Sequence, residues 1–162
     1  MNTFTLEKLI HAPQAVVWEK LADFGNVSIF NPMVEHSTLL GNQQCGLGAT
    51  RSCTFYDGKS VEEKITDWQE GRSLTIAITR GDMPVKTANI RVSLHDAGSN
   101  TTRVRIDGEF EMKSGIADAI IGPLMMKPMM KKMLGDVFKG LDAHCQTGKH
   151  IGKGGVLLSA SK

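Results

Sequence analysis

The chain has only three cysteines, and their spacing matches neither a disulfide framework nor a zinc site. Cys45, Cys53 and Cys145 are scattered, and none belongs to a CxxC pair. His144 and His150 lie near Cys145, but this arrangement does not resemble a structural metal site. We therefore expect no metal, and we predict a reducing, cytoplasmic location. The N-terminus also lacks a basic leader followed by an apolar stretch, so we expect no signal peptide.

Long apolar runs and an excess of one charge are absent as well. No stretch of about 18 apolar residues exists, so we expect no membrane-spanning helix. The formal net charge is only +2, which gives no reason to expect nucleic acid as a partner. The GxSxG and HExxH motifs, phosphate loops and dinucleotide fingerprints are missing too, and we expect no cofactor. The oligomeric state is left open.

The periodicity of the apolar residues predicts one α+β domain. Residues 3–10 alternate as a strand, and residues 13–22 have helical spacing. Strands with short Gly- and Asp-containing turns then continue to residue 113. The clearest strand has Val104, Ile106, Gly108, Phe110 and Met112 on one face and charged residues on the other.

Beyond Gly115 the apolar period becomes helical and predicts one long C-terminal helix that ends at Gly148. Pro128 is expected near its start or at a kink. The simplest closure is a curved antiparallel sheet of seven strands around this helix, with two short helices between strands 1 and 2. We assign residues 1–147 to the domain and residues 148–162 to a flexible tail.

Short motifs in a fixed order carry a family resemblance. They are Ile10-x-Ala12-Pro13-x-x-Val16-Val17-Trp18-x-x-Leu21-x-Asp23-Phe24, Asn31-Pro32, Gly46-x-Gly48-x-x-Arg51, Asp57-Gly58-x-x-Val61-x-Glu63-x-Ile65 and Met83-Pro84-Val85. Over residues 3–147 the chain resembles the START-like (SRPBCC) superfamily of polyketide cyclase/dehydrase and lipid-transport proteins. The resemblance implies a helix-grip fold whose internal cavity binds lipids, hormones, polyketides or other apolar molecules. Some members catalyse cyclisation or aromatisation, so the fold alone does not decide the chemistry.

Two titratable residues are candidates for the polar end of the cavity. Glu63 shares the inward face of Val61 and Ile65 unless a bulge reverses the register and exposes it. His36 alternates with Val34, and it is either a ligand contact and proton donor or a histidine at the rim. The plant abscisic-acid receptors are relatives in this superfamily, and the resemblance to them implies a glutamate and a basic residue at these positions in the cavity.

Three further features are candidates for the lining of the cavity: a third polar residue, a turn and the methionines. Arg51 could pair with Glu63, hold a ligand carboxylate or lie exposed. The turn 81–85 is either a plain hairpin or, as the resemblance implies, a gate loop that brings Met83 and Val85 to the ligand. Six of the nine methionines lie between Met112 and Met133, which suits an adaptable cavity wall or an ordinary helix core.

We therefore expect a carrier or sensor that binds a small apolar molecule, with polar contacts from His36, Arg51 and Glu63. The alternative is a cyclase or aromatase in which His36 and Glu63 transfer protons. The remaining predicted ligand-binding residues are Cys53, Phe55, Val61, Ile76, Ile78, Met83, Val85, Ile90, Ile106, Phe110, Met130, Met133 and Val137.

Overall fold

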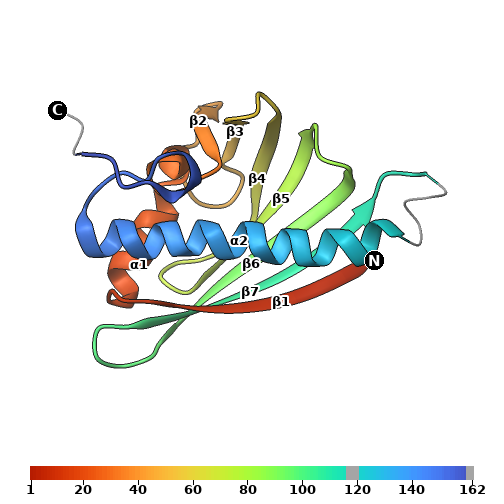
Figure 1. The fold of residues 1–162 in the computed structure, drawn as a ribbon. Coiled ribbons are helices and arrows are strands. Elements are labelled where there is room, and N and C mark those ends of the chain that lie inside the picture. Colours follow the sequence, from red (N-terminus) through yellow and green to blue (C-terminus); the bar gives the residue numbers. More distant parts are fainter. Residues whose placement is uncertain (116–120, 160–162) are drawn as a thin grey trace.

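A computed structural model describes residues 1–115 and 121–159, and its main feature is a curved sheet wrapped around one long helix (Figure 1). The seven strands have the order β1-β7-β6-β5-β4-β3-β2, and every neighbouring pair is antiparallel. The strands are β1 (Asn2–Ile10), β2 (Val34–Leu40), β3 (Thr50–Phe55), β4 (Ser60–Gln69), β5 (Ser73–Gly81), β6 (Val85–Asp96) and β7 (Thr102–Met112). The helices are α1 (Gln14–Ala22), the 3-10 helix η1 (Phe24–Ile29), α2 (Ile121–Thr147) and the 3-10 helix η2 (Lys153–Gly155). The predicted helix-grip architecture is confirmed, with α1 and η1 as the two short helices between the first two strands.

The alternation along β7 has the predicted consequence. Val104, Ile106 and Phe110 are completely buried, and Arg103 and Arg105, which flank Val104, are exposed. A sheet with one solvated face requires this period of two residues. Gly108 belongs to the inner face, and the ring of Phe4 from β1 occupies the space where a side chain at position 108 would lie.

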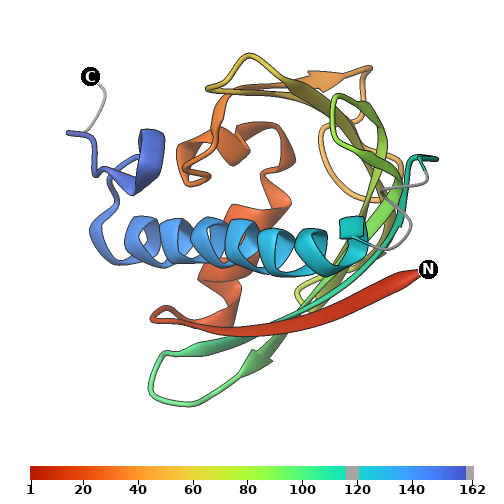
Figure 2. The ribbon, with the colours of Figure 1, turned by 45° about the vertical axis from the view of Figure 1, so that its right-hand side comes forward.

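The long helix α2 fills the concave side of the sheet, as Figure 2 shows. Met126, Met130 and Leu141 point into the core and are at most 5% exposed. Pro128 lies within the helix on its exposed side, two turns from the first residue, and α2 continues through it. Within residues 1–115 and 121–159, no helix is long and apolar enough to cross a membrane.

The C-terminal segment, predicted as a flexible tail over residues 148–162, folds back onto the domain through residues 151–154. Ile151 is 2% exposed, and its backbone N–H donates a hydrogen bond of 2.7 Å to the carbonyl oxygen of Ile29. The N–H of Gly154 donates to the carbonyl oxygen of Pro32. A single buried isoleucine in a glycine-rich stretch has no periodicity, so the sequence offers no signal for this docking. Residues 160–162 lie outside the described residues.

Candidate functional site

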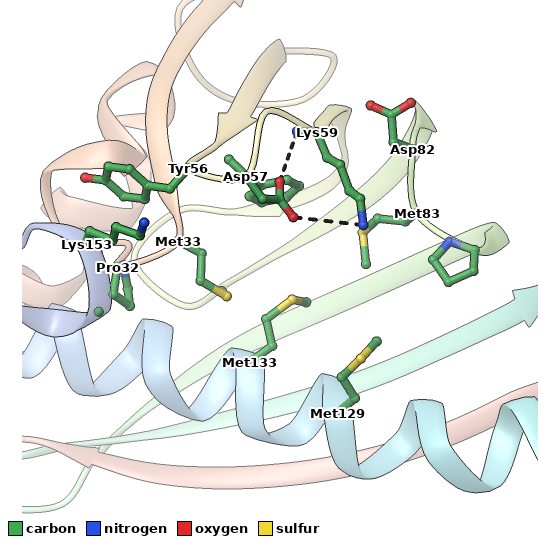
Figure 3. A pocket seen from close by; sticks show the side chains of 13 residues that line it. Pro32, Met33, Tyr56, Asp57, Lys59, Asp82, Met83, Met129, Met133 and Lys153 are labelled. Carbon is green, nitrogen blue, oxygen red and sulfur yellow. Dashed lines mark hydrogen bonds and ion pairs between the residues drawn. The ribbon is translucent and has the colours of Figure 1, made fainter.

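An apolar pocket opens between α2 and the turns at one end of the sheet (Figure 3). Its volume is about 490 Å³, which is within the size range of small-molecule sites. It is lined by Pro32, Met33, Phe55, Tyr56, Asp57, Lys59, Asp82, Met83, Pro84, Met129, Met133, Lys153 and Gly154. Methionine thioethers from α2 and from two turns, at positions 133, 33 and 83, point into the space. We call this pocket the mouth.

Two smaller pockets lie deeper in the molecule, with volumes of about 100 and 70 Å³. Both are lined by Asn31, Arg51, Glu63, Ile90, Leu134 and Val137. The smaller one also shares Met33, Phe55, Met83 and Met133 with the mouth. The three spaces therefore form one series that leads from an apolar entrance to a polar pair in the core.

That polar pair is formed by Arg51 on β3 and Glu63 on β4, which are directly opposite each other in the sheet. Nε and one terminal nitrogen of Arg51 both lie 2.6 Å from the same oxygen, Oε2 of Glu63. The other terminal nitrogen donates to the carbonyl oxygen of Phe24 at 2.8 Å, and the Phe24 ring covers the guanidinium at 4.0 Å. A charge this far from solvent is tolerated because it is paired and hydrogen-bonded. Of the three alternatives for Arg51, the structure has the pairing with Glu63.

Cys53 lies beside the pair, with its Sγ atom 3.8 Å from Oε2 of Glu63. Burial, and then the negative charge of Glu63, raise the pKa of the Cys53 thiol from 9.0 to about 12. Since the thiolate is the nucleophilic form, this thiol is protonated and unreactive at neutral pH.

The raised pKa of the Cys53 thiol makes the stability of the fold sensitive to alkaline pH. Between pH 9 and 12 the unfolded chain loses the Cys53 proton while the folded chain retains it. The free energy of unfolding therefore falls as pH rises through this window, by at most about 1.4 kcal/mol per pH unit. Urea unfolding at pH 8 and pH 10 measures the change. Between these two pH values, we expect the free energy of unfolding to fall less in Cys53→Ala than in the wild type. Cys45 is exposed, so Cys45→Ala should show the same fall as the wild type. Equal decreases in all three proteins would contradict the assignment.

Most of the predicted ligand-binding residues border the three spaces. They are Arg51, Cys53, Phe55, Val61, Glu63, Ile76, Ile78, Met83, Ile90, Met130, Met133 and Val137. Val85, Ile106 and Phe110 are buried in the core but line neither the mouth nor the deep pockets. The turn before β6 does border the mouth through Met83, and its movement as a gate stays a prediction.

The expectation that His36 points into the cavity is wrong. A bulge between Val34 and His36 changes the register of β2 against β3, so His36 pairs with Thr54 and Ser37 pairs with Cys53. Directly paired residues share a face, and Cys53 lies on the inner face. The His36 side chain is consequently 76% exposed, 3.9 Å from the carboxylate of Glu35.

Several residues that line the site were not predicted from the sequence, Asn31 and Lys153 among them. Asn31 lines both deep pockets, but beside Pro32 it reads only as a turn residue. Lys153 reaches the mouth from the tail and lies 5.9 Å from the centre of the Tyr56 ring. Neither position has a local pattern, because each depends on a contact between distant parts of the chain.

Comparison with known proteins identifies the family of the chain. Residues 1–146 match the family described as polyketide cyclase / dehydrase and lipid transport. The chain belongs to this family. Membership confirms the resemblance seen in the sequence and supports the binding of hydrophobic ligands in general. A search of curated protein sequences finds no match.

Solved structures share the fold at low sequence identity. XoxI from Bacillus cereus has a TM-score of 0.76 and 18% identity, covering 91% of this chain and 97% of that one. A protein from Nitrosospira multiformis has a TM-score of 0.70 and 16% identity, with coverages of 90% and 97%. Ara h 8.0201 has a TM-score of 0.66 and 16% identity, with coverages of 90% and 98%. At these identities the likeness concerns the fold alone.

Proposed function

We propose that this polyketide cyclase/dehydrase and lipid transport family member binds one small hydrophobic molecule in the mouth and the deep pockets, as a carrier or sensor. The observation that carries the proposal is the apolar entrance that leads to a buried Arg51–Glu63 pair. Methionine side chains around the entrance adapt to different apolar shapes. Burial of the ligand supplies affinity at roughly 25 cal/mol per Å² of apolar surface.

The alternative function, a cyclase or aromatase, requires both His36 and Glu63 as proton-transfer groups, and only Glu63 lies in the cavity. A proton-transfer pair must reach the same bound molecule. Glu63 lines the deep pockets, whereas His36 points to solvent from the outer face of β2. This geometry favours binding without acid-base catalysis by His36 and Glu63.

Blocking the entrance tests the proposal. Met133 lines both the mouth and the adjacent deep pocket, and Met125 lies 68% exposed on the same helix. We expect Nile red, an uncharged apolar dye, to bind the wild type saturably at one site. Met133→Trp fills the passage and weakens binding at least about tenfold, whereas Met125→Trp binds like the wild type. Fluorescence titration measures both, and circular dichroism confirms that the variants are folded.

Two results would contradict the proposal: no saturable binding of apolar probes to the wild type, or unchanged binding to a folded Met133→Trp variant. If binding is confirmed, native mass spectrometry of freshly purified protein, followed by denaturing extraction, identifies any molecule that is carried through purification.

A further inference from the structure

The carboxylate of Glu63 uses only one of its two oxygens within the protein. Both contacts from Arg51 and the contact from Cys53 go to Oε2. In the described part of the chain, no group donates a hydrogen bond to Oε1. No buried side-chain oxygen or nitrogen lacks a partner among these residues, so Oε1 must retain accessible surface. Glu63 lines both deep pockets, and its free oxygen is an acceptor available to a ligand there.

Three of the five N–H groups of the Arg51 guanidinium are directed at protein acceptors. Each of its three nitrogens has a protein acceptor, and the ring of Phe24 covers one of its faces. The positive charge is neutralised by Glu63 at 2.6 Å. Among the described residues that line the deep pocket adjacent to the mouth, Arg51 is the only cationic one, whereas Lys20 borders the larger deep pocket. A ligand carboxylate in the adjacent pocket would therefore approach the Glu63 carboxylate without a further cation to balance it, which is unfavourable in a poorly solvated pocket.

Asn31 adds a hydrogen-bond donor to the lining of the same two pockets. Its Oδ1 accepts the backbone N–H of Met33 at 3.0 Å, and this contact orients the amide group. No acceptor for Nδ2 is found in residues 1–115 or 121–159. Asn31 and Glu63 border the same two small pockets. A hydroxyl group can donate to Glu63 and accept from Asn31 at once, because it has both a proton and lone pairs.

We propose that the ligand carries an uncharged hydrogen-bond donor, a hydroxyl group, at the end that reaches Glu63. This inference rests on the proposed function and specifies the ligand class as apolar alcohols. The apolar body lies in the mouth, where the methionines surround it, and the hydroxyl group enters the adjacent deep pocket. Fatty acids of the same length are disfavoured.

A matched series of probes tests this specificity on the wild-type protein. Decan-1-ol, decyl methyl ether, decanoate and decylammonium share one apolar chain and differ at the polar end. Displacement of Nile red at pH 7.5 measures their dissociation constants below their aggregation limits. We expect decan-1-ol to bind about tenfold or more tightly than decyl methyl ether and decanoate, since neither of these can donate a hydrogen bond to the charged acceptor. Decylammonium should also bind less tightly than the alcohol, because Arg51 already balances the charge of Glu63 and an ion pays a larger desolvation cost in the pocket.

Substitution of Glu63 then identifies the group responsible. Glu63→Gln removes the negative charge and leaves the Arg51 charge unbalanced, so we expect decanoate to bind as well as or better than decan-1-ol. Glu62→Gln is the matched control, because Glu62 pairs with Arg80 at 3.9 Å and lines none of the three spaces. It should retain the alcohol preference of the wild type.

The outcomes separate this inference from the proposed function. If the four probes bind equally, or if an ionised probe binds most tightly, the protein is a hydrophobic-ligand binder and the alcohol assignment is wrong. If neither Nile red nor any decyl probe binds, both proposals fail. The wild-type series decides the matter even if Glu63→Gln does not fold, and an alcohol preference that persists in folded Glu63→Gln would also overturn the assignment.

Discussion

Replacing Arg51 with methionine should lower the free energy of unfolding by about 3–5 kcal/mol, the usual cost of removing one partner of a buried ion pair. The substitution leaves Glu63 without its counter-charge and the carbonyl oxygen of Phe24 without its donor. Urea unfolding followed by circular dichroism measures the change. Arg91→Met is the matched control, since Arg91 and its partner Asp67 are 43% and 45% exposed. Its expected cost is at most about 1 kcal/mol.

The double variant Arg51→Met/Glu63→Leu shows why the single substitution is costly. Removal of both charges leaves no uncompensated ion, and apolar replacements of similar size are often neutral or stabilising. We therefore expect the double variant to recover most of the lost stability. A double variant as unstable as Arg51→Met would mean that the loss comes from packing around Phe24 and not from the unpaired carboxylate. The stable double variant should also lack the alcohol preference, because the acceptor is gone.

The second large effect is expected at Gly140 in α2. An added Cβ atom at this position would overlap the carbonyl oxygen of Phe30, and it would lie 3.3 Å from Cδ of Pro32. The carbonyl belongs to the backbone and cannot rotate away, so α2 must move from the segment that follows η1. We expect Gly140→Ala to reduce the free energy of unfolding by about 1–3 kcal/mol, as overpacked cores do. This loss occurs although alanine is the better helix former.

Gly135 on the same helix is the control position, where substitution by alanine should change the free energy of unfolding in the opposite direction. Its added Cβ atom would lie 3.4 Å from Cε and 3.7 Å from Nζ of Lys8, and 4.0 Å from Cδ2 of Leu6. These are ordinary contact distances, and all three atoms belong to side chains. Gly135→Ala should therefore raise the free energy of unfolding by up to about 1 kcal/mol through helix propensity. Thermal unfolding of both variants compares the two positions. A loss of stability in Gly135→Ala, or none in Gly140→Ala, would contradict this account of how α2 packs.

Much of the fold could be predicted from the sequence because its signals are local. The alternation in β7 and the helical period after Gly115 depend only on which side chains avoid water, and both are present in the structure. The antiparallel sheet follows from short turns between successive strands. The sequence alone does not place Pro128 within the long helix. A proline inside a helix is tolerated when its side of the helix is exposed, and exposure is a property of the packed structure.

The candidate site was predicted in part, and the errors have a common origin. Strand alternation placed Glu63 and Arg51 on the inner face correctly. The same alternation failed for His36, because a bulge adds one residue to β2 and reverses the side chains beyond it. Val85, Ile106 and Phe110 do point inward, but packing fills the space around them.

The sequence by itself determined the class of fold and the inward faces of the strands, except in β2 beyond its bulge. These properties follow from periodicity, which each segment carries without reference to the others. The family resemblance follows instead from short motifs in a fixed order along the chain. Only the tertiary structure decided that Arg51 is neutralised, that Oε1 of Glu63 accepts no hydrogen bond from the described residues, and that Asn31 and Lys153 border the site. Such features depend on distances between segments far apart in the chain, and those distances are set by how the sheet curves around α2.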